Sequence, residues 1–243
     1  MFDISIIFIF LSFFIGFSIQ GIFGFAGAMT TMLIAMTFTN DIASLIYLCV
    51  YPSIGVSTMI IFESYKNFDF KSAIFIFVFA LLGTILGSYI FDIINHKYLL
   101  IVLGIVLMFS YLFNTLNLKV NHFFSKILIF VAGVVQGITS TGGPLNAMGI
   151  RDIYKNNKNK FRIGSCVFAL TSNISRIVQY QMQGNFDIVQ YIKYWPIIPI
   201  TILSSIIGIK IKNKISDKNF SKYISYVILL CGFIFLYKGI KGL

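Results

Sequence analysis

One arginine lies inside an apolar stretch that is long enough to span a membrane. Arg176 falls within the segment from Ile163 to Met182, where a charged side chain costs at least about 2.5 to 3.5 kcal/mol at the helix centre. Ser172, Asn173 and Gln179 are three or four residues away from this arginine, a spacing that places polar side chains on one helical face. The pattern predicts a polar face at membrane depth, with a guanidinium that needs a partner.

The acidic residues offer no evident partner for this arginine. All eight lie at the edges of apolar segments: Asp3, Asp41, Glu63, Asp69, Asp92, Asp152, Asp187 and Asp217. A guanidinium suits planar and tetrahedral oxyanions, so a transported anion is a candidate partner. Two other interpretations stay open, because Arg176 could instead reach an interface by snorkelling or pair with an acid for structural reasons.

Two further segments combine glycine with polar residues at membrane depth. The first contains Gly16, Gly21, Gly24 and Gly27 with Gln20; the second contains Gly133, Gly137, Gly142, Gly143 and Pro144 with Gln136, Thr139, Ser140, Thr141 and Asn146. Glycine costs about 1 kcal/mol relative to alanine inside a helix, and proline costs about 3 kcal/mol. Both segments should therefore break, which a bilayer tolerates only where the backbone is buried in protein or lines a watery cavity.

Such breaks can bind an anion through freed amides and the positive ends of half-helices. The alternative is close helix packing through small residues, which applies most to Gly16–Gly21 and Gly133–Gly137. We predict that substrate-binding residues lie in both breaks and beside the arginine. They are Gln20, Gly21, Gly24, Gly27, Gln136, Thr139, Ser140, Thr141, Gly142, Gly143, Asn173, Arg176 and Gln179.

The composition fits a membrane protein that carries these segments. Of the 243 residues 58% are hydrophobic and 11% are charged, with a mean hydropathy of +0.88, whereas an average soluble domain is about 25% charged. The net charge of +11 lies in short segments between apolar runs, which indicates topology rather than nucleic-acid binding. Cys49, Cys166 and Cys231 lie inside apolar runs and form no metal or redox motif. We expect a polytopic, all-α membrane protein without cofactor or metal.

Eight apolar runs, each bounded by polar or turn residues, form two sets of four. They are Ile4–Phe38, Ile42–Phe62, Ser72–Phe91 and Tyr98–Phe113, then Phe124–Ile150, Ile163–Met182, Tyr194–Ile209 and Tyr223–Tyr237. Short motifs recur between the sets in the same order. They are Gln20-Gly21-Ile22 and Gln136-Gly137-Ile138, Gly27 and Gly143, Asn67-Phe68-Asp69 and Asn185-Phe186-Asp187, and Gly83-Thr84-Ile85-Leu86-Gly87 and Ser204-Ser205-Ile206-Ile207-Gly208. We predict two homologous modules, 1–118 and 119–243.

The charges of the loops favour an inverted arrangement of the two modules. If each glycine-rich segment enters and returns as a re-entrant hairpin, fourteen Lys and Arg residues face the cytoplasm and four face outward. If each crosses once, eleven face inward and seven outward. Since basic residues favour the cytoplasmic side, we expect inverted repeats in a cytoplasmic (inner) membrane.

The glycine-rich segments resemble those of the TauE/SafE family of sulfite and organosulfonate exporters. In that family each of two modules opens with a segment of the type G-x-x-x-G-x-x-G-x-G-G followed by proline. The counterparts are Gly16 to Ala28 and Gly133 to Leu145. The first departs from the pattern with Phe25-Ala26-Gly27-Ala28, and the second has Thr139-Ser140-Thr141 where small glycines are usual. The resemblance implies export of a small sulfur-containing anion.

Together these features predict a secondary transporter that works by alternating access at a midplane site. An anion channel and a non-transporting membrane subunit stay open as alternatives. No HExxH or GxxxxGK[ST] motif is present, so neither a metalloprotease-type enzyme nor direct use of ATP is expected. The expected partners are a small anionic solute and the lipid bilayer, without nucleic acid, and a homodimer is one option for the assembly.

Overall fold

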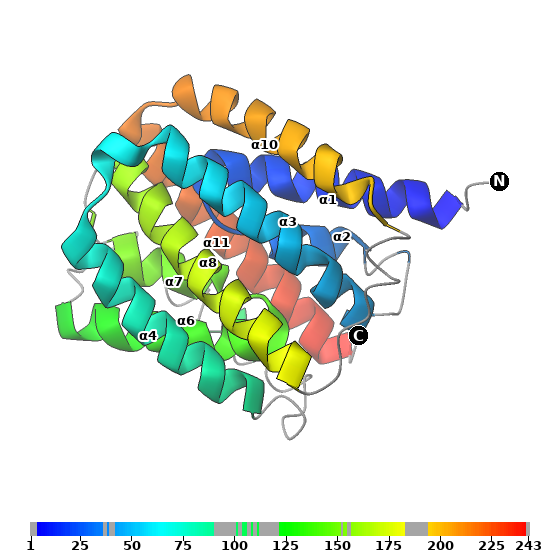
Figure 1. Ribbon diagram of the computed structural model, residues 1–243, viewed down its shortest axis with the longest axis horizontal. Helices are drawn as coiled ribbons and strands as arrows, with labels where there is room; N and C mark the ends of the chain where they lie inside the picture. The colour runs from blue at the N-terminus through cyan, green and yellow to red at the C-terminus, as the bar shows by residue number, and fades with distance from the viewer. Residues whose placement is uncertain are drawn as a thin grey trace.

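The computed structural model describes residues 4–35, 38, 42–89, 101, 104–105, 108, 111, 122–151, 153–154, 157–182 and 194–241. Over these residues the chain is helical throughout (Figure 1). The helices are α1 (Ile4–Phe23), α2 (Gly27–Ala35), α3 (Ile42–Glu63), the 3₁₀ helix η1 (Tyr65–Asn67), α4 (Phe70–Tyr89), α6 (His122–Thr139), α7 (Gly143–Arg151), α8 (Lys158–Met182), α10 (Ile197–Asn213) and α11 (Asp217–Lys241). The predicted apolar run 98–113 and the 185–187 motif lie largely or wholly outside the described residues.

Most helix bounds lie close to those predicted from the apolar runs. The main differences are α8 and α11, which begin at Lys158 and Asp217 rather than at Ile163 and Tyr223 and so include basic residues that we assigned to loops. The side-chain oxygen of Asn157 accepts a hydrogen bond from the backbone N–H of Lys160 at 3.0 Å. Asn157 therefore caps the helix ahead of the apolar run.

Both glycine-rich segments are interrupted, as expected. The first gives α1 and α2 on either side of residues 24–26, and the second gives α6 and α7 on either side of residues 140–142. Each short helix folds back on the helix before it. A Cβ built on Gly16 of α1 would lie 2.6 Å from the carbonyl oxygen of Gly27, and one built on Gly149 of α7 would lie 3.2 Å from that of Ser125.

The two halves of the chain interleave. Helix α1 packs along α10, α6 packs along α4, and α3 packs along α8 between those pairs (Figure 1). Matching positions in the two pairs make equally close approaches. A Cβ on Gly21 would lie 2.5 Å from the carbonyl oxygen of Ser205, and a Cβ on Gly137 would lie 2.5 Å from that of Thr84. Small residues thus allow the helices to touch backbone to backbone, and the recurring motifs are the ones in contact.

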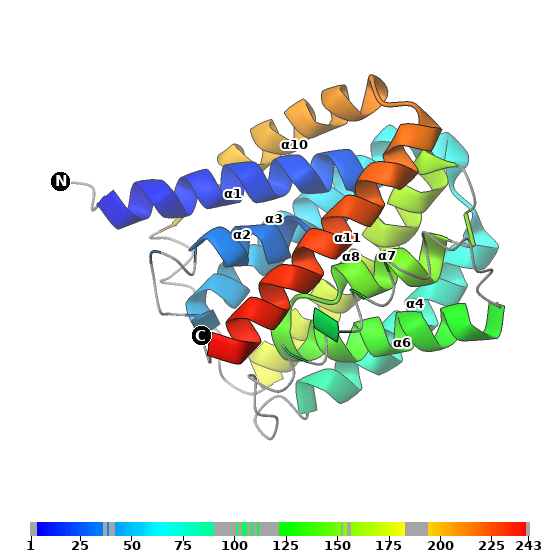
Figure 2. The ribbon, with the colours of Figure 1, turned by 180° about the vertical axis from the view of Figure 1, so that it is seen from behind.

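Helix α11 crosses the bundle on the side of α7 and α8 (Figure 2). Large apolar side chains point outward from several helices, including Phe14 of α1, Phe77 of α4 and Leu203 of α10. Among the described residues three helices are long and apolar enough to cross a membrane: Ile6–Phe23, Phe70–Tyr89 and Asp217–Lys241. Tyr47–Glu63 and Phe123–Ile138 are shorter apolar helices. These features are compatible with a membrane protein.

Candidate functional site

The two helix breaks begin with the same kind of backbone turn. The amide of Gly24 donates to the carbonyl oxygen of Gln20 at 2.7 Å, and the amide of Ser140 donates to that of Gln136 at 3.0 Å. Both of these terminal residues have positive φ, 81° at Gly24 and 60° at Ser140. Glycine adopts this region freely, whereas serine does so at a cost. A left-handed residue therefore ends α1 and α6, and it turns the chain into the next helix.

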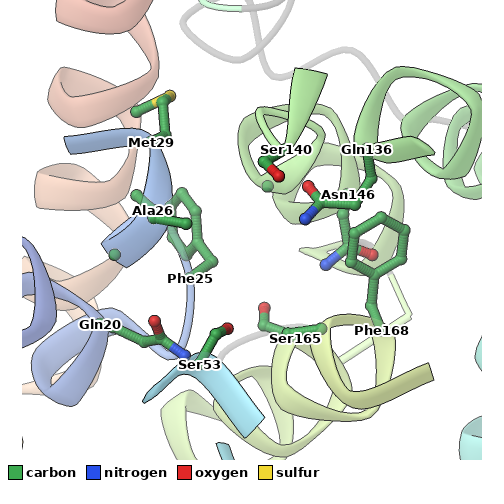
Figure 3. Close-up of a pocket in the computed structure, with 14 residues that line it drawn as sticks. Gln20, Phe25, Ala26, Met29, Ser53, Gln136, Ser140, Asn146, Ser165 and Phe168 are labelled. Atoms are coloured by element: carbon green, nitrogen blue, oxygen red, sulfur yellow. The ribbon is translucent and has the colours of Figure 1, made fainter. Parts of the chain in front are cut away.

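A small cavity of about 30 Å³ lies between the two breaks (Figure 3). The first break and the helices beside it contribute Gln20 and residues 25–29 to the lining. The second break and the helices beside it contribute Gln136, Ser140, Gly143 and Asn146. Helix α3 adds Ser53, and α8 adds Ser165, Phe168 and Ala169. The cavity is small, so it suits a compact ligand.

Several polar groups around the cavity are held by other side chains or amides. The Gln20 amide nitrogen donates to the Ser57 hydroxyl at 3.1 Å, and the Gln136 side-chain oxygen accepts from the Gly142 amide at 2.9 Å. Asn173 does not line the cavity itself. Its amide nitrogen donates to the Ser53 hydroxyl at 3.0 Å, so it fixes a hydroxyl that does.

Two other lining residues have polar atoms without a protein partner among the described residues. Both side-chain atoms of Asn146, Nδ2 and Oδ1, and the hydroxyl of Ser165 are buried and make no hydrogen bond. The two residues are 0% and 1% exposed. An unsatisfied buried polar group costs about 1 to 3 kcal/mol. Three such atoms around one cavity indicate that the site is built for a polar occupant.

Arg176 reaches the cavity through a lining residue. Its guanidinium is buried, with 1% of the residue exposed, and its Nη1 donates to the hydroxyl of Ser140. This contact brings a cation to the second break. The position excludes the snorkelling interpretation within the described chain, because a side chain so buried does not extend to an exposed surface.

A second arginine of α8 corrects the sequence analysis. We assigned Arg162 and Lys212 to cytoplasmic loops, but they are 0% and 2% exposed. Arg162 donates to Glu63 at 2.9 Å and to the carbonyl oxygen of Gly21 at 2.8 Å, and Lys212 donates to Glu63 at 3.0 Å. Glu63 therefore neutralises buried cations from two helices, a role that its place at a segment edge did not suggest.

The remaining predicted residues divide between the cavity and the packing around it. Gly27 and Gly143 line the cavity, whereas Gly21, Gly24, Thr141, Gly142, Asn173 and Arg176 do not. Gly24 packs on Arg162, since a Cβ there would lie 2.9 Å from the Arg162 Cα. Thr139 ends α6, and its side chain lies outside the described residues. Gln179 lines a different, largely apolar hollow between α4 and α8.

The sequence analysis did not include Asn146, Ser165 and Ser53 among the predicted substrate-binding residues. The positions of the first two carry a usable signal. Asn146 lies three residues after Gly143, and Ser165 lies eleven residues before Arg176, so each shares a helical face with a predicted residue. Ser53 has no such signal, because its place beside the cavity depends on how α3 packs on α8.

One comparison with known proteins identifies a family for the chain. The family described as Sulfite exporter TauE/SafE matches residues 8–235 of the chain. No curated protein and no solved structure matches significantly. The family match spans both helix breaks, all of Phe70–Tyr89, and most of Ile6–Phe23 and Asp217–Lys241.

Proposed function

The chain belongs to the sulfite exporter TauE/SafE family, and on that premise we propose that it exports a small anion through the cavity between its two helix breaks. The family and the apolar helices identify a multi-pass membrane protein, and members of this family are transporters rather than enzymes. The anion is sulfite or an organosulfonate, and the membrane is the cytoplasmic one.

The observation that carries this proposal is the polar cavity beside a buried guanidinium. Asn146 and Ser165 present unsatisfied polar atoms to it, and Ser140 connects it to Arg176. A buried guanidinium and neutral hydrogen-bond donors are the groups that stabilise an oxyanion away from water. No acidic residue lines the cavity, so an anion would meet no like charge there.

Alternating access would follow from the way the two halves interleave. We take residues 1–118 and 119–243 as inverted repeats, in which the α1–α10 pair corresponds to the α6–α4 pair. The near-identical glycine contacts of Gly21 and Gly137 support this correspondence. Arg162 and Lys212 are buried, so they do not count as loop cations. Both were counted on the cytoplasmic side in each of the two topologies considered above, so the inverted arrangement keeps its larger excess of basic residues inside. Rocking of one pair against the other would expose the central cavity to each side in turn.

Flux in proteoliposomes tests this function. Vesicles that contain the purified chain should take up labelled sulfite with saturable kinetics, and internal unlabelled sulfite should accelerate that uptake by exchange. Conductance without saturation or exchange would identify a channel instead. Vesicles that match protein-free controls in both measurements would identify a non-transporting subunit and overturn the proposal.

A further inference from the structure

Asn146 is the most completely buried polar side chain that faces the cavity without a partner. It lies in the first turn of α7 and is 0% exposed. Its backbone amide donates to the carbonyl oxygen of Gly142 at 3.0 Å, while both polar atoms of its side chain have no partner among the described residues. Figure 3 shows it beside Gln136, on the opposite side of the cavity from Gln20.

A carboxamide makes two different demands on a ligand. Its nitrogen donates and its oxygen accepts, and this holds whichever way the amide is turned. An occupant that satisfies Asn146 must therefore carry both an acceptor and a donor. The Ser165 hydroxyl can either donate or accept, so it adapts to whichever atom lies near it.

A fully deprotonated oxyanion meets only half of this requirement. All its oxygens accept, so the side-chain oxygen of Asn146 would stay unsatisfied and would face a negatively charged oxygen. A monoprotonated oxyanion carries one hydroxyl, which can donate to that oxygen while its other oxygens accept from the amide nitrogen. The difference is the cost of one unsatisfied buried acceptor.

Charge and size narrow the ligand further. None of the lining residues is titratable. Two charged side chains lie beside residues that line the cavity: Arg176 contacts Ser140, and Arg162 lies one turn before Ser165 and pairs with Glu63. These cations favour an anion over a neutral acid, and a volume of about 30 Å³ favours a compact one.

We propose that Asn146 recognises the hydroxyl of a compact monoprotonated oxyanion of the hydrogensulfite type and discriminates against fully deprotonated oxyanions such as sulfate. This inference rests on the proposed anion site and names the form of the anion that the site accepts. It also assigns Asn146 as the residue that sets this selectivity.

Equilibrium binding to the purified chain tests the inference without transport. Calorimetry would compare sulfite with sulfate between about pH 6 and about pH 8, where sulfite passes from its monoprotonated to its fully deprotonated form while sulfate stays deprotonated. At the lower pH, sulfate should bind at least about tenfold more weakly than sulfite. Affinity for total sulfite should fall as the pH rises.

Variants of Asn146 connect this selectivity to the carboxamide. Asn146→Leu keeps the volume but removes both demands, so the ratio of the two affinities should shrink to within about threefold. Asn146→Asp places a carboxylate in the cavity and should weaken the binding of both anions at the higher pH. Asn67→Leu, the same change in η1 away from the cavity, should leave the ratio unchanged.

Three results would overturn the inference. They are equal binding of sulfate and sulfite to the wild-type chain at the lower pH, a sulfite affinity that does not change with pH, and an unchanged ratio in Asn146→Leu. The wild-type measurements decide the matter even if a variant does not fold. Selective binding without flux in proteoliposomes would refute the proposed export and leave this inference standing. Flux together with equal binding of both anions would support the export and refute this inference.

Discussion

The two buried arginines of α8 sit at the two helix breaks and have different surroundings. Arg162 pairs with Glu63 and donates to the carbonyl oxygen of Gly21 beside the first break. Arg176 lies fourteen residues further along, about 21 Å on the helix axis, and donates to Ser140 in the second break. The first arginine is part of an ion cluster that holds helices together. The second contacts a residue that lines the cavity.

The two helix breaks also differ in the side chains that they contribute to the cavity. The first contributes one polar side chain, Gln20, together with Phe25, Ala26 and Met29, whereas the second and α7 contribute three polar side chains, Gln136, Ser140 and Asn146. One side is therefore mainly an apolar wall, and the other brings polar groups and a cation. If the proposed function holds, a similar backbone turn serves packing in one half and anion binding in the other, and the following variants test that division.

The largest effect should come from removing the charge at the second break. Arg176→Gln should lower sulfite flux by at least about 100-fold, because the anion loses a cation that neutral donors replace poorly in a buried site. Arg176→Lys keeps the charge without the planar fork and should retain part of the flux. Lys160→Gln removes a cation from the same helix away from the cavity, and it should change little. Unchanged flux in Arg176→Gln would remove this residue from the site.

The first break should respond in stability rather than in selectivity. Gly24→Ala forces a Cβ into a residue with φ of 81° and to within 2.9 Å of the Arg162 Cα, so the free energy of unfolding should fall by about 1 to 3 kcal/mol. Gly55→Ala is the matched control, because a Cβ there meets nothing within 4 Å. Denaturant unfolding in detergent measures both. A neutral Gly24→Ala would show that the backbone turn is not fixed by its contact with α8.

The ion cluster beside the first break should also contribute to stability. Glu63→Gln removes the charge shared by Arg162 and Lys212, and about 1 to 2 kcal/mol should be lost, because the Glu63 side chain is 29% exposed and water offsets part of the effect. Asp217→Asn breaks a longer, more exposed pair with Lys158 at 3.7 Å and should cost less. Equal unfolding free energies for the two variants would contradict the structural role of the cluster.

The smallest effect is expected at Ser140, where two variants distinguish the role of the hydroxyl from that of the backbone turn. Ser140→Gly relieves the positive φ but removes the contact with Arg176, so flux should fall about tenfold with no loss of unfolding free energy. Ser140→Ala removes the same hydroxyl and keeps a Cβ at φ of 60°. The two variants should match in flux while Ser140→Gly is more stable. Full flux in both would show that the hydroxyl does not orient the arginine for binding.

The breaks could be predicted from sequence because their cause is local. Clustered glycines, joined by a proline in the second segment, destabilise a helix wherever they occur, and the interruptions at residues 24–26 and 140–142 follow. Arg162 could not be placed in this way. It follows Lys158 and Lys160 in what reads as a basic loop, and its partner Glu63 lies 99 residues earlier.

Helical geometry explains the other departure. Gln179 and Asn173 lie on opposite sides of Arg176 in the sequence, six residues apart, and six residues turn a helix by about 600°, so these two side chains diverge by about 120°. That rotation carries Gln179 to the hollow beside α4. The cavity itself could not be predicted, because it forms only where α3, α7 and α8 meet.

Locating a bound anion tests the central claim most directly. A structure of the chain with selenite, a heavier analogue of sulfite, would place the selenium by its anomalous scattering. The account predicts one selenium in the cavity, within hydrogen-bonding reach of Ser140, Asn146 and Ser165. A selenium beside Arg162 or in the hollow lined by Gln179, with none in the cavity, would contradict it.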